Sequence, residues 1–202
     1  MLVETENVYE KIAHHFSNTR SRPWKWVEIY LASLPHKSLV YDIGCGNGRN
    51  MYSEHLNIIG VDTCDAFLSI CKESKLEVVK SCMTKLPFIS GTADSIISIA
   101  SFHHLKTHSE RMSALSEMNR VMKKNTSLLI SVWSKNQPPK TRRIFSNFGD
   151  VIVPWNKFGK VYNRYYYIFS INELETMFEC SGFEIKTHFH TCGNEVFILI
   201  KK

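Results

Sequence analysis

The sequence of 202 residues has no apolar run close to the roughly 20 residues that a membrane-spanning helix needs, so no membrane association is expected. Its first residues include Glu4, Glu6 and Glu10 and form no apolar segment, which argues against a signal peptide. The six cysteines include no C-x-x-C pair and follow no framework spacing. They predict reduced thiols in a cytosolic or nuclear protein, without a disulfide framework.

Two common phosphate-binding patterns are also missing. Gly44, Gly46 and Gly48 follow the apolar run 38–43, but the third glycine comes one residue too early for G-x-G-x-x-G. Arg49 stands where a P-loop would continue with Lys and Ser or Thr. The pattern therefore predicts a buried strand that enters a tight loop, whose backbone approaches a ligand other than a pyrophosphate.

Two acids accompany the glycine loop. Asp42 lies at the end of the first strand, and Asp62 follows a second strand, 58–61. The spacing from Gly44 to Asp62 is close to the roughly 20 residues that separate a glycine turn from the acid that holds a ribose. The run Asp-x-Gly-x-Gly-x-Gly resembles the first motif of class I S-adenosylmethionine methyltransferases. That cofactor is cationic at its amino group and sulfonium, so an acid at this loop is favourable.

Strands and helices alternate along the chain. Helices are predicted at 4–16, 24–34, 65–74 with Asp65 as its N-cap, 109–122 and 171–180, and strands at 38–43, 58–61, 76–79, 94–100, 126–133, 183–188 and 196–200. This order predicts one α/β domain over 1–202, with a mostly parallel sheet, helices on both faces and an antiparallel pair at the end. Ligands of such sheets bind beyond the carboxyl ends of the strands, where Asp42, Asp62, Cys82 and Ala100 fall.

One segment carries the whole excess of positive charge. Residues 135–170 hold seven Lys and Arg against one Asp, and the formal net charge of the chain is +6. The same segment is rich in aromatic residues. Such interleaving favours a nucleic-acid surface, although a solvated cap with its own small apolar core has the same composition.

Histidines follow the fourth predicted strand. His103 and His104 could orient a substrate or act as a base, or they could be a packing and a surface histidine. His104 and His108 have the spacing of a helical metal pair, but a third ligand is not evident, so no metal is assigned to this chain. Residues 1–37 could form a helical lid, or a helix that only packs.

Several short elements together resemble one narrow family. They are His-Phe-Ser-Asn-Thr-Arg-Ser-Arg-Pro-Trp at 15–24, Asp-Ile-Gly-Cys-Gly-Asn-Gly at 42–48, Ile-Ser-Ile-Ala-Ser-Phe-His-His at 97–104, Val-Pro-Trp at 153–155 and Arg-Tyr-Tyr at 164–166. The chain is similar to the eukaryotic tRNA wobble-uridine carboxymethyl methyltransferases over nearly its whole length. The resemblance implies a Rossmann-like class I fold with a seven-stranded sheet. It also implies methyl esterification of 5-carboxymethyluridine in tRNA, with S-adenosylhomocysteine as the second product, and a heterodimer with a small zinc-binding activator protein.

The residues expected to serve this chemistry fall into three groups. A carboxylate is ionised at neutral pH and needs no general base, so a cation should position it. Arg20 is the first candidate and Arg164 the second, with His103 or His104 orienting the base. The predicted cofactor contacts are Tyr9, Asp42, Gly44, Gly46, Asp62, Cys82, Met83 and Ala100. The predicted base-stacking residues are Trp133, Trp155 and Tyr165, and the predicted phosphate contacts are Lys140, Arg142, Arg143, Lys157 and Lys160.

One position departs from the family pattern. Before Leu86 and Pro87, the relatives usually have an acid that binds the adenine amino group, and this chain has Cys82. A thiol is a weak partner, so adenine binding would depend on backbone groups and on Met83 or Leu86. Two other functions stay open at this point: a methyltransferase for a small molecule, and a non-catalytic RNA-binding scaffold with the same fold.

Overall fold

The computed structural model describes residues 5–141 and 143–202, with the side chains of residues 5–7 excepted. Its main feature is a seven-stranded sheet in the order β3-β2-β1-β4-β5-β9-β8. The parallel strands are β1 (Leu39–Ile43), β2 (Asn57–Asp62), β3 (Val78–Lys80), β4 (Ala93–Ile99) and β5 (Met122–Trp133). Strands β8 (Phe183–Thr191) and β9 (Asn194–Lys201) pair antiparallel at one edge. The predicted fold class is confirmed.

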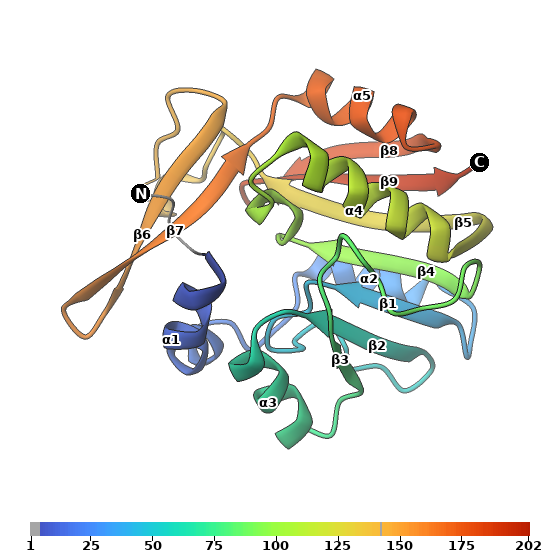
Figure 1. The fold of residues 1–202 in the computed structure, drawn as a ribbon, viewed down its shortest axis with the longest axis horizontal. Helices are drawn as coiled ribbons and strands as arrows, with labels where there is room; N and C mark the ends of the chain where they lie inside the picture. The colour runs from blue at the N-terminus through green and yellow to red at the C-terminus, as the bar shows by residue number, and fades with distance from the viewer. Residues whose placement is uncertain (1–4, 142) are drawn as a thin grey trace.

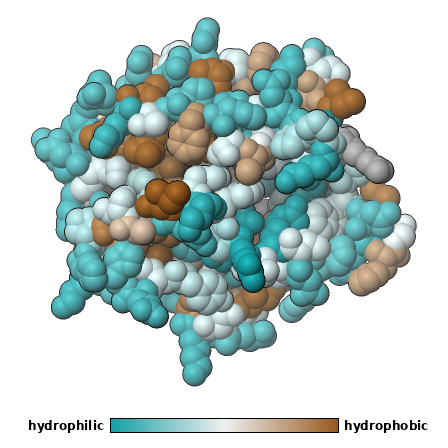
Figure 2. Space-filling model, turned by 180° about the vertical axis from the view of Figure 1, so that it is seen from behind, coloured by the Kyte–Doolittle hydropathy of each residue, from teal (hydrophilic) through white to brown (hydrophobic). Residues whose placement is uncertain are grey.

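Helices cover both faces of this sheet (Figure 1). Helices α4 (His108–Val121) and α5 (Ile171–Cys180) bury Leu115 and Phe178 against one face. Helix α2 (Lys25–Ala32) packs Val27 and Leu31 against the other. The strands supply alternate residues to each side, which is why their sequences are apolar throughout. Viewed from behind, the surface is mostly hydrophilic with small hydrophobic groups (Figure 2).

Two further helices and two short turns of 3-10 helix lie outside the main sheet. Helix α1 (Thr5–Asn18) lies against α3 (Asp65–Glu73), with Ala13 and Phe67 in a small core of their own. The 3-10 turns are η1 (Phe102–His104) and η2 (Pro139–Thr141). The N-cap of α3 is Cys64, so the prediction of Asp65 was wrong: the Glu10 carboxylate of α1 accepts the amides of Asp65 and Ala66 instead. No helix in the described ranges is long and apolar enough to cross a bilayer.

The basic aromatic segment forms a two-stranded hairpin outside the main sheet. Strand β6 (Gly149–Lys157) pairs antiparallel with β7 (Lys160–Ile168), and the hairpin extends beside α1 (Figure 1). Val153 and Tyr166 bury one face of it against Trp133 at the end of β5. The segment therefore has the small apolar core of the second alternative, while its role as a nucleic-acid surface stays a prediction.

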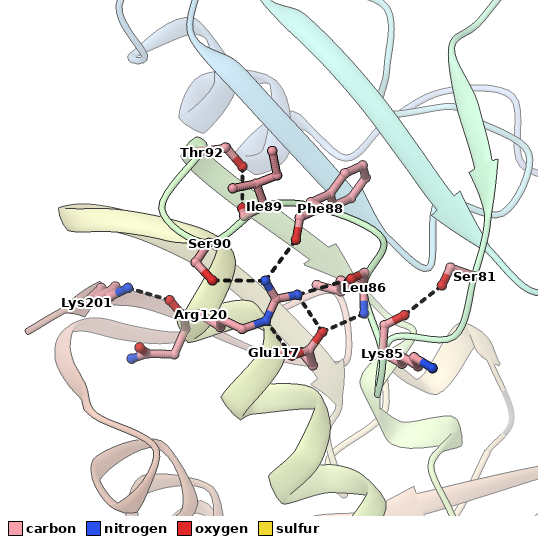
Figure 3. Close-up of polar contacts among 11 residues, drawn as sticks. Ser81, Lys85, Leu86, Phe88, Ile89, Ser90, Thr92, Glu117, Arg120 and Lys201 are labelled. Carbon is pink, nitrogen blue, oxygen red and sulfur yellow. Dashed lines mark hydrogen bonds and ion pairs between the residues drawn. The ribbon is translucent and has the colours of Figure 1, made fainter.

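A polar cluster fixes the loop that leads from β3 to β4. Arg120 of α4 donates to the carbonyl groups of Leu86 and Phe88, and Glu117 accepts the Leu86 amide (Figure 3). The Glu117–Arg120 pair itself joins Oε1 and Nε at 2.6 Å. The backbone groups of the β3–β4 loop, which has no regular secondary structure, are thereby hydrogen-bonded. These bonds also restrict the positions of the preceding residues Cys82 and Met83.

Candidate active site

A cavity of about 1260 Å³ opens beyond the carboxyl ends of β1, β2 and β4. Its lining residues come from the loop after β1, from α1 and the segment that follows it, and from the β6–β7 hairpin. Such a position is where open α/β sheets bind their ligands. The cavity therefore joins the three regions that the sequence singled out.

The glycine loop has the geometry of a ligand cradle. Gly44 has φ +78°, and a Cβ there would overlap the side chain of Ser101. Gly46 has φ +54°, and a Cβ there would meet nothing within 4 Å because it would extend into open space. Residues 49–56, all of them described, form turns and bends and not the helix that would present its N-terminus to a phosphate.

The two acids differ in how they are satisfied. Asp62 accepts the amide of Gly46 at 2.8 Å through Oδ2 and the amide of Cys64 at 3.0 Å through Oδ1, so it braces the loop. Asp42 is fully buried, and neither of its oxygens has a hydrogen-bond partner among the described residues. Burial, and secondarily the charge of Asp62, raise the pKa of Asp42 to about 7. The charge of Arg49 and the side chain of Asn50 partly offset this rise in pKa, and because Asp42 is absent from the cavity lining, its contact with a cationic ligand stays a prediction.

The predicted cofactor contacts fit S-adenosylmethionine. Gly46 leaves room for its chain, and Asp62, Cys82, Met83 and Ala100 line the same cavity, whereas Asp42 lies beneath the loop and is absent from the lining. Ala100 has φ +53°, a left-handed conformation that is uncommon outside glycine and turns the chain sharply at the end of β4. Cys82 is exposed, and its thiol accepts a hydrogen bond from the Thr84 hydroxyl at 3.1 Å.

Five arginines line this cavity: Arg20, Arg22, Arg49, Arg143 and Arg164. In the described part of the chain, none of them pairs with a carboxylate within 4 Å. Burial lowers the pKa of Arg49 to about 10 and also lowers the pKa values of Arg20 and Arg143. The nearby Asp42 carboxyl group partly offsets this effect at Arg49, but the guanidinium groups outnumber it and make a cavity suited to an anion.

Trp155 brings the two predicted carboxylate-binding residues together. The guanidinium carbon of Arg20 lies 4.9 Å from the Trp155 ring centroid and that of Arg164 lies 4.8 Å from it. Arg164 is buried, and its Nε has no partner among the described residues. Cation–π contact holds both side chains, and although Arg20 donates to Thr19 and Arg164 to Tyr166, each keeps further N–H donors for another acceptor.

Trp133 is differently placed from what the stacking prediction requires. Tyr166 stacks on it at 4.1 Å between centroids, and Arg143 lies 4.3 Å from the same centroid. Two groups this close must occupy opposite faces of the ring, so a base cannot stack on Trp133 unless one of them moves. The prediction for Trp133 is corrected accordingly: it supports Arg143 and Tyr166.

Tyr165 was also assigned the wrong direction. Its hydroxyl donates to Asp150 and approaches Arg111, and Tyr165 is absent from the cavity lining. Side chains alternate along β7, so Arg164 and Tyr166 face the cavity while Tyr165 faces away. The sequence run Arg-Tyr-Tyr did not reveal which tyrosine faces inward.

Burial lowers the pKa of both histidines, and the two have different partners. His103 is fully buried, lies outside the cavity lining and accepts the Trp133 amide through Nδ1 at 3.0 Å. His104 lines the cavity, and burial lowers its pKa to about 4. It contacts Tyr9 and the Tyr165 carbonyl, and no group of three possible metal ligands occurs among the described residues.

The predicted phosphate contacts lie apart from the cavity lining, with the exception of Arg143. Lys157 donates to the Lys11 carbonyl at 2.6 Å, Lys160 lies 5.5 Å from the Tyr162 ring, and Lys140 is exposed. Arg142 lies outside the described residues. Three lysines outside the cavity remain predicted contacts for a polyanion.

Several residues that line the cavity were not predicted from the sequence. Arg49 follows the third glycine directly and was considered only as evidence against a P-loop. Tyr166 and Phe16 belong to the quoted motifs but received no role, and Asn47 donates to the Arg20 carbonyl at 2.9 Å. The adjacency of Arg49 to the loop was the available signal.

Comparison with known proteins agrees with this geometry. A model of the methyltransferase domain matches residues 41–130. A tRNA (carboxymethyluridine(34)-5-O)-methyltransferase of Schizosaccharomyces pombe is 34% identical over 93% of this chain and 94% of its own length. The chain belongs to this family. A Xenopus tropicalis member, alkbh8, is 32% identical over 96% of this chain, which spans about 40% of that relative.

Solved structures confirm the fold. A SAM-dependent methyltransferase from Methanosarcina mazei superposes with a TM-score of 0.72 at 18% identity, covering 89% of this chain and 98% of that one. A putative methyltransferase of Haloferax volcanii, solved in complex with the Trm112 methyltransferase activator, superposes with a TM-score of 0.71 at 13% identity, covering 98% and 97%. At these identities the likeness concerns the fold, while the family assignment depends on the sequence relatives.

Proposed function

We propose that this chain transfers a methyl group from S-adenosylmethionine to the carboxylate of 5-carboxymethyluridine at the wobble position of tRNA. The observation that carries this proposal is the group of five arginines in the same cavity as the glycine loop, none of which forms an ion pair with a carboxylate in the described chain. An acceptor with a negative charge would find its counter-charge there. The family assignment supplies the identity of the acid.

The chain's own residues then have defined roles. Arg20 and Arg164, both over Trp155, would hold the two carboxylate oxygens and leave a lone pair directed at the methyl carbon. No residue needs to remove a proton, because a carboxylic acid with a pKa near 4 is already ionised at pH 7. The neutral state of His104 agrees with this, since its imidazole is occupied by hydrogen bonds and is not poised as a base.

The cofactor would lie across the glycine loop. When bound, it supplies an electrophilic methyl group on a cationic sulfur. Asp62 would accept hydrogen bonds from its sugar, Asp42 would offset its positive charge, and Arg49 would meet its carboxylate. Met83 and the backbone beside Cys82 would surround the adenine, because Cys82 offers only a weak hydrogen-bond partner.

The partner and the location belong to this proposal as well. The heterodimer with a small zinc-binding activator is supported by the fold shared with the Haloferax methyltransferase that was solved with its activator. Reduced cysteines agree with a cytoplasmic protein, with a nuclear fraction permitted. The exposed lysines of the hairpin segment would contact tRNA phosphates.

The test is methyl transfer by the chain, co-expressed with the activator, to tRNA carrying carboxymethyluridine, read by mass spectrometry of the nucleosides. Arg164→Lys and Arg20→Lys should each lower kcat/KM at least tenfold, because an ammonium group cannot form the paired contact. Lys124→Gln, at the opposite end of the sheet, is the matched control and should change nothing. Turnover of the amide 5-carbamoylmethyluridine at an equal rate would contradict the assigned acceptor.

Two other results would favour the alternatives. Activity on small acids that is insensitive to salt and to loss of hairpin cations would indicate a small-molecule methyltransferase. No calorimetric binding of S-adenosylmethionine with the activator present would indicate a non-catalytic RNA-binding protein.

A further inference from the structure

An unbroken line of hydrogen bonds connects Arg164 to the loop after β4. Arg164 Nη1 lies 2.7 Å from the Tyr166 hydroxyl, which lies 3.2 Å from the Tyr9 hydroxyl. Tyr9 in turn lies 3.1 Å from Nε2 of His104, whose Nδ1 lies 2.8 Å from the Tyr165 carbonyl. Three separate segments, helix α1, turn η1 and strand β7, contribute to this line.

The donor of every bond follows from its two ends. The Tyr165 carbonyl can only accept, so Nδ1 of His104 carries the proton and Nε2 must accept. Tyr9 therefore donates to His104, which obliges Tyr166 to donate to Tyr9. The guanidinium can only donate, and it fills the remaining acceptor position of Tyr166. All hydrogen bonds in the line run from Arg164 toward the Tyr165 carbonyl.

The direction of these hydrogen bonds matters because Arg164 and Tyr166 are buried. Arg164 is 1% exposed and Tyr166 is 2% exposed, so water does not substitute for a missing partner. Arg164 has no carboxylate partner in the described chain, and the line fixes one of its donors. The neutral state of His104, which its low pKa favours, keeps its Nε2 available as an acceptor.

We propose that this directed relay positions Arg164, with Tyr166, Tyr9 and His104 as positioning residues, and that it is complete only when α1 lies over the cavity. This inference rests on the proposed function, because Arg164 is taken to hold the acceptor carboxylate. It changes two earlier assignments. Tyr9 positions Arg164 through its hydroxyl group and does not bind the cofactor. His104 accepts a hydrogen bond from Tyr9 and does not act as a base.

The first test is independent of activity. In protein labelled with ¹⁵N-histidine, long-range ¹H–¹⁵N correlation at pH 7 should show His104 as the Nδ1-H tautomer and His103 as the Nε2-H tautomer. The Tyr9→Phe variant should shift only the unprotonated nitrogen of His104, since that atom loses its donor. A charged His104, or an Nε2-H tautomer, would overturn the relay even if the enzyme proves active.

The second test is kinetic and uses tRNA carrying carboxymethyluridine. Tyr9→Phe should lower kcat about tenfold or more, and the Kd for S-adenosylhomocysteine should stay within twofold. Tyr167→Phe removes a hydroxyl of β7 that is bonded to Glu173 of α5, so it is the matched control and should leave kcat unchanged. A raised Kd with unchanged kcat would assign Tyr9 to the cofactor and end the proposal.

A double variant separates a relay from two unrelated structural effects. His104→Phe keeps a ring but removes the acceptor, whereas His104→Gln keeps an oxygen that Tyr9 can reach. The double variant Tyr9→Phe/His104→Phe should lose no more activity than either single change, and His104→Gln should recover part of it. Fully additive losses would contradict the proposal. If the wild type methylates nothing, the proposed function has failed, while the tautomers still decide the relay.

Discussion

At the scale of single residues, Gly44 is required for two separate reasons. Its φ of +78° is costly for any other residue, and the space for a Cβ is taken by Ser101. Gly91 separates the two effects, because it has φ +69° with nothing within 4 Å of its Cβ position. Comparison of alanine substitutions at these two glycines thus measures the cost of the steric overlap at Gly44 separately from the strain in φ.

We expect Gly44→Ala to lower the free energy of unfolding by about 1–3 kcal/mol more than Gly91→Ala does, because only Gly44 adds a steric overlap to the strain in φ. Urea denaturation of both variants measures this difference. The Gly44 variant should also lose affinity for S-adenosylhomocysteine, since Ser101 or the loop must shift. Equal losses of stability in the two variants would show that the loop adapts freely.

Asp42 predicts a dependence of stability on pH. Its folded pKa of about 7 exceeds the ordinary value near 4, so its contribution is fully present below pH 4 and is lost as the pH rises through 7. Relative to Asp42→Asn, the unfolding free energy of the unliganded wild type should therefore fall by about 1.4 kcal/mol for each unit of pH across this window. Denaturation of both proteins at pH 4.5, 6 and 8 measures it. A difference that does not change with pH would refute the unpaired state of Asp42.

Much of the residue-level site could be predicted from the chain. Gly44, Gly46 and Asp62 lie together at the cavity, as the fixed spacings of a strand end, a glycine turn and an acid led us to expect, while their contact with the cofactor stays a prediction. Tyr165 was wrongly directed, because the face that a residue presents depends on pairing register, which a short aromatic run does not reveal. Trp133 does line the cavity, but the sequence did not show that Tyr166 and Arg143 cover its ring. Arg49 was overlooked because its role depends on a cavity formed by segments distant in sequence.

At the scale of elements, α1 and the β6–β7 hairpin hold each other over the cavity. Trp155 donates from Nε1 to Nδ1 of His15 at 3.1 Å, and the Lys157 ammonium group donates to the Lys11 carbonyl. The sequence predicted the helix but not the hairpin. Its strands carry bulky side chains on both faces, so the simple apolar–polar alternation of a surface strand is absent.

We expect Trp155→Phe to loosen this contact, because the ring remains while its N–H donor is lost. Hydrogen–deuterium exchange should become faster in α1 and at the hairpin, while β1, β4 and β5 keep their protection. Trp26→Phe, on the opposite face of the sheet, serves as the comparison. Unchanged exchange in α1 would mean that the helix is held by the Glu10 contact to α3 alone.

At the scale of the whole molecule, positive charge gathers at one end of the sheet. The hairpin segment and the cavity arginines lie at the carboxyl ends of the parallel strands, whereas Lys124 and Lys202 lie at the other end. This distribution should orient an approaching polyanion. The sequence alone located the charge in the chain, but the topology placed it beside the cavity.

The Lys140→Gln/Lys160→Gln variant should lower the salt dependence of tRNA binding by about one unit of log–log slope for each lysine that contacts a phosphate. Filter binding between 50 and 300 mM KCl measures the slope. The matched variant Lys124→Gln/Lys202→Gln has the same change in charge and should keep the wild-type slope. Equal effects in both variants would indicate that net charge matters and that no oriented contact exists.

The crowding of guanidinium groups in one cavity also bears on the end of a catalytic cycle. Esterification would turn an anionic ligand into a neutral one, so the mutual repulsion of Arg20 and Arg164 would return as the product forms. The same arrangement that favours entry of the acid thus favours departure of its ester. Inhibition by the esterified tRNA should be weak, because the uncharged ester should dissociate from the cavity faster than the anionic acid does.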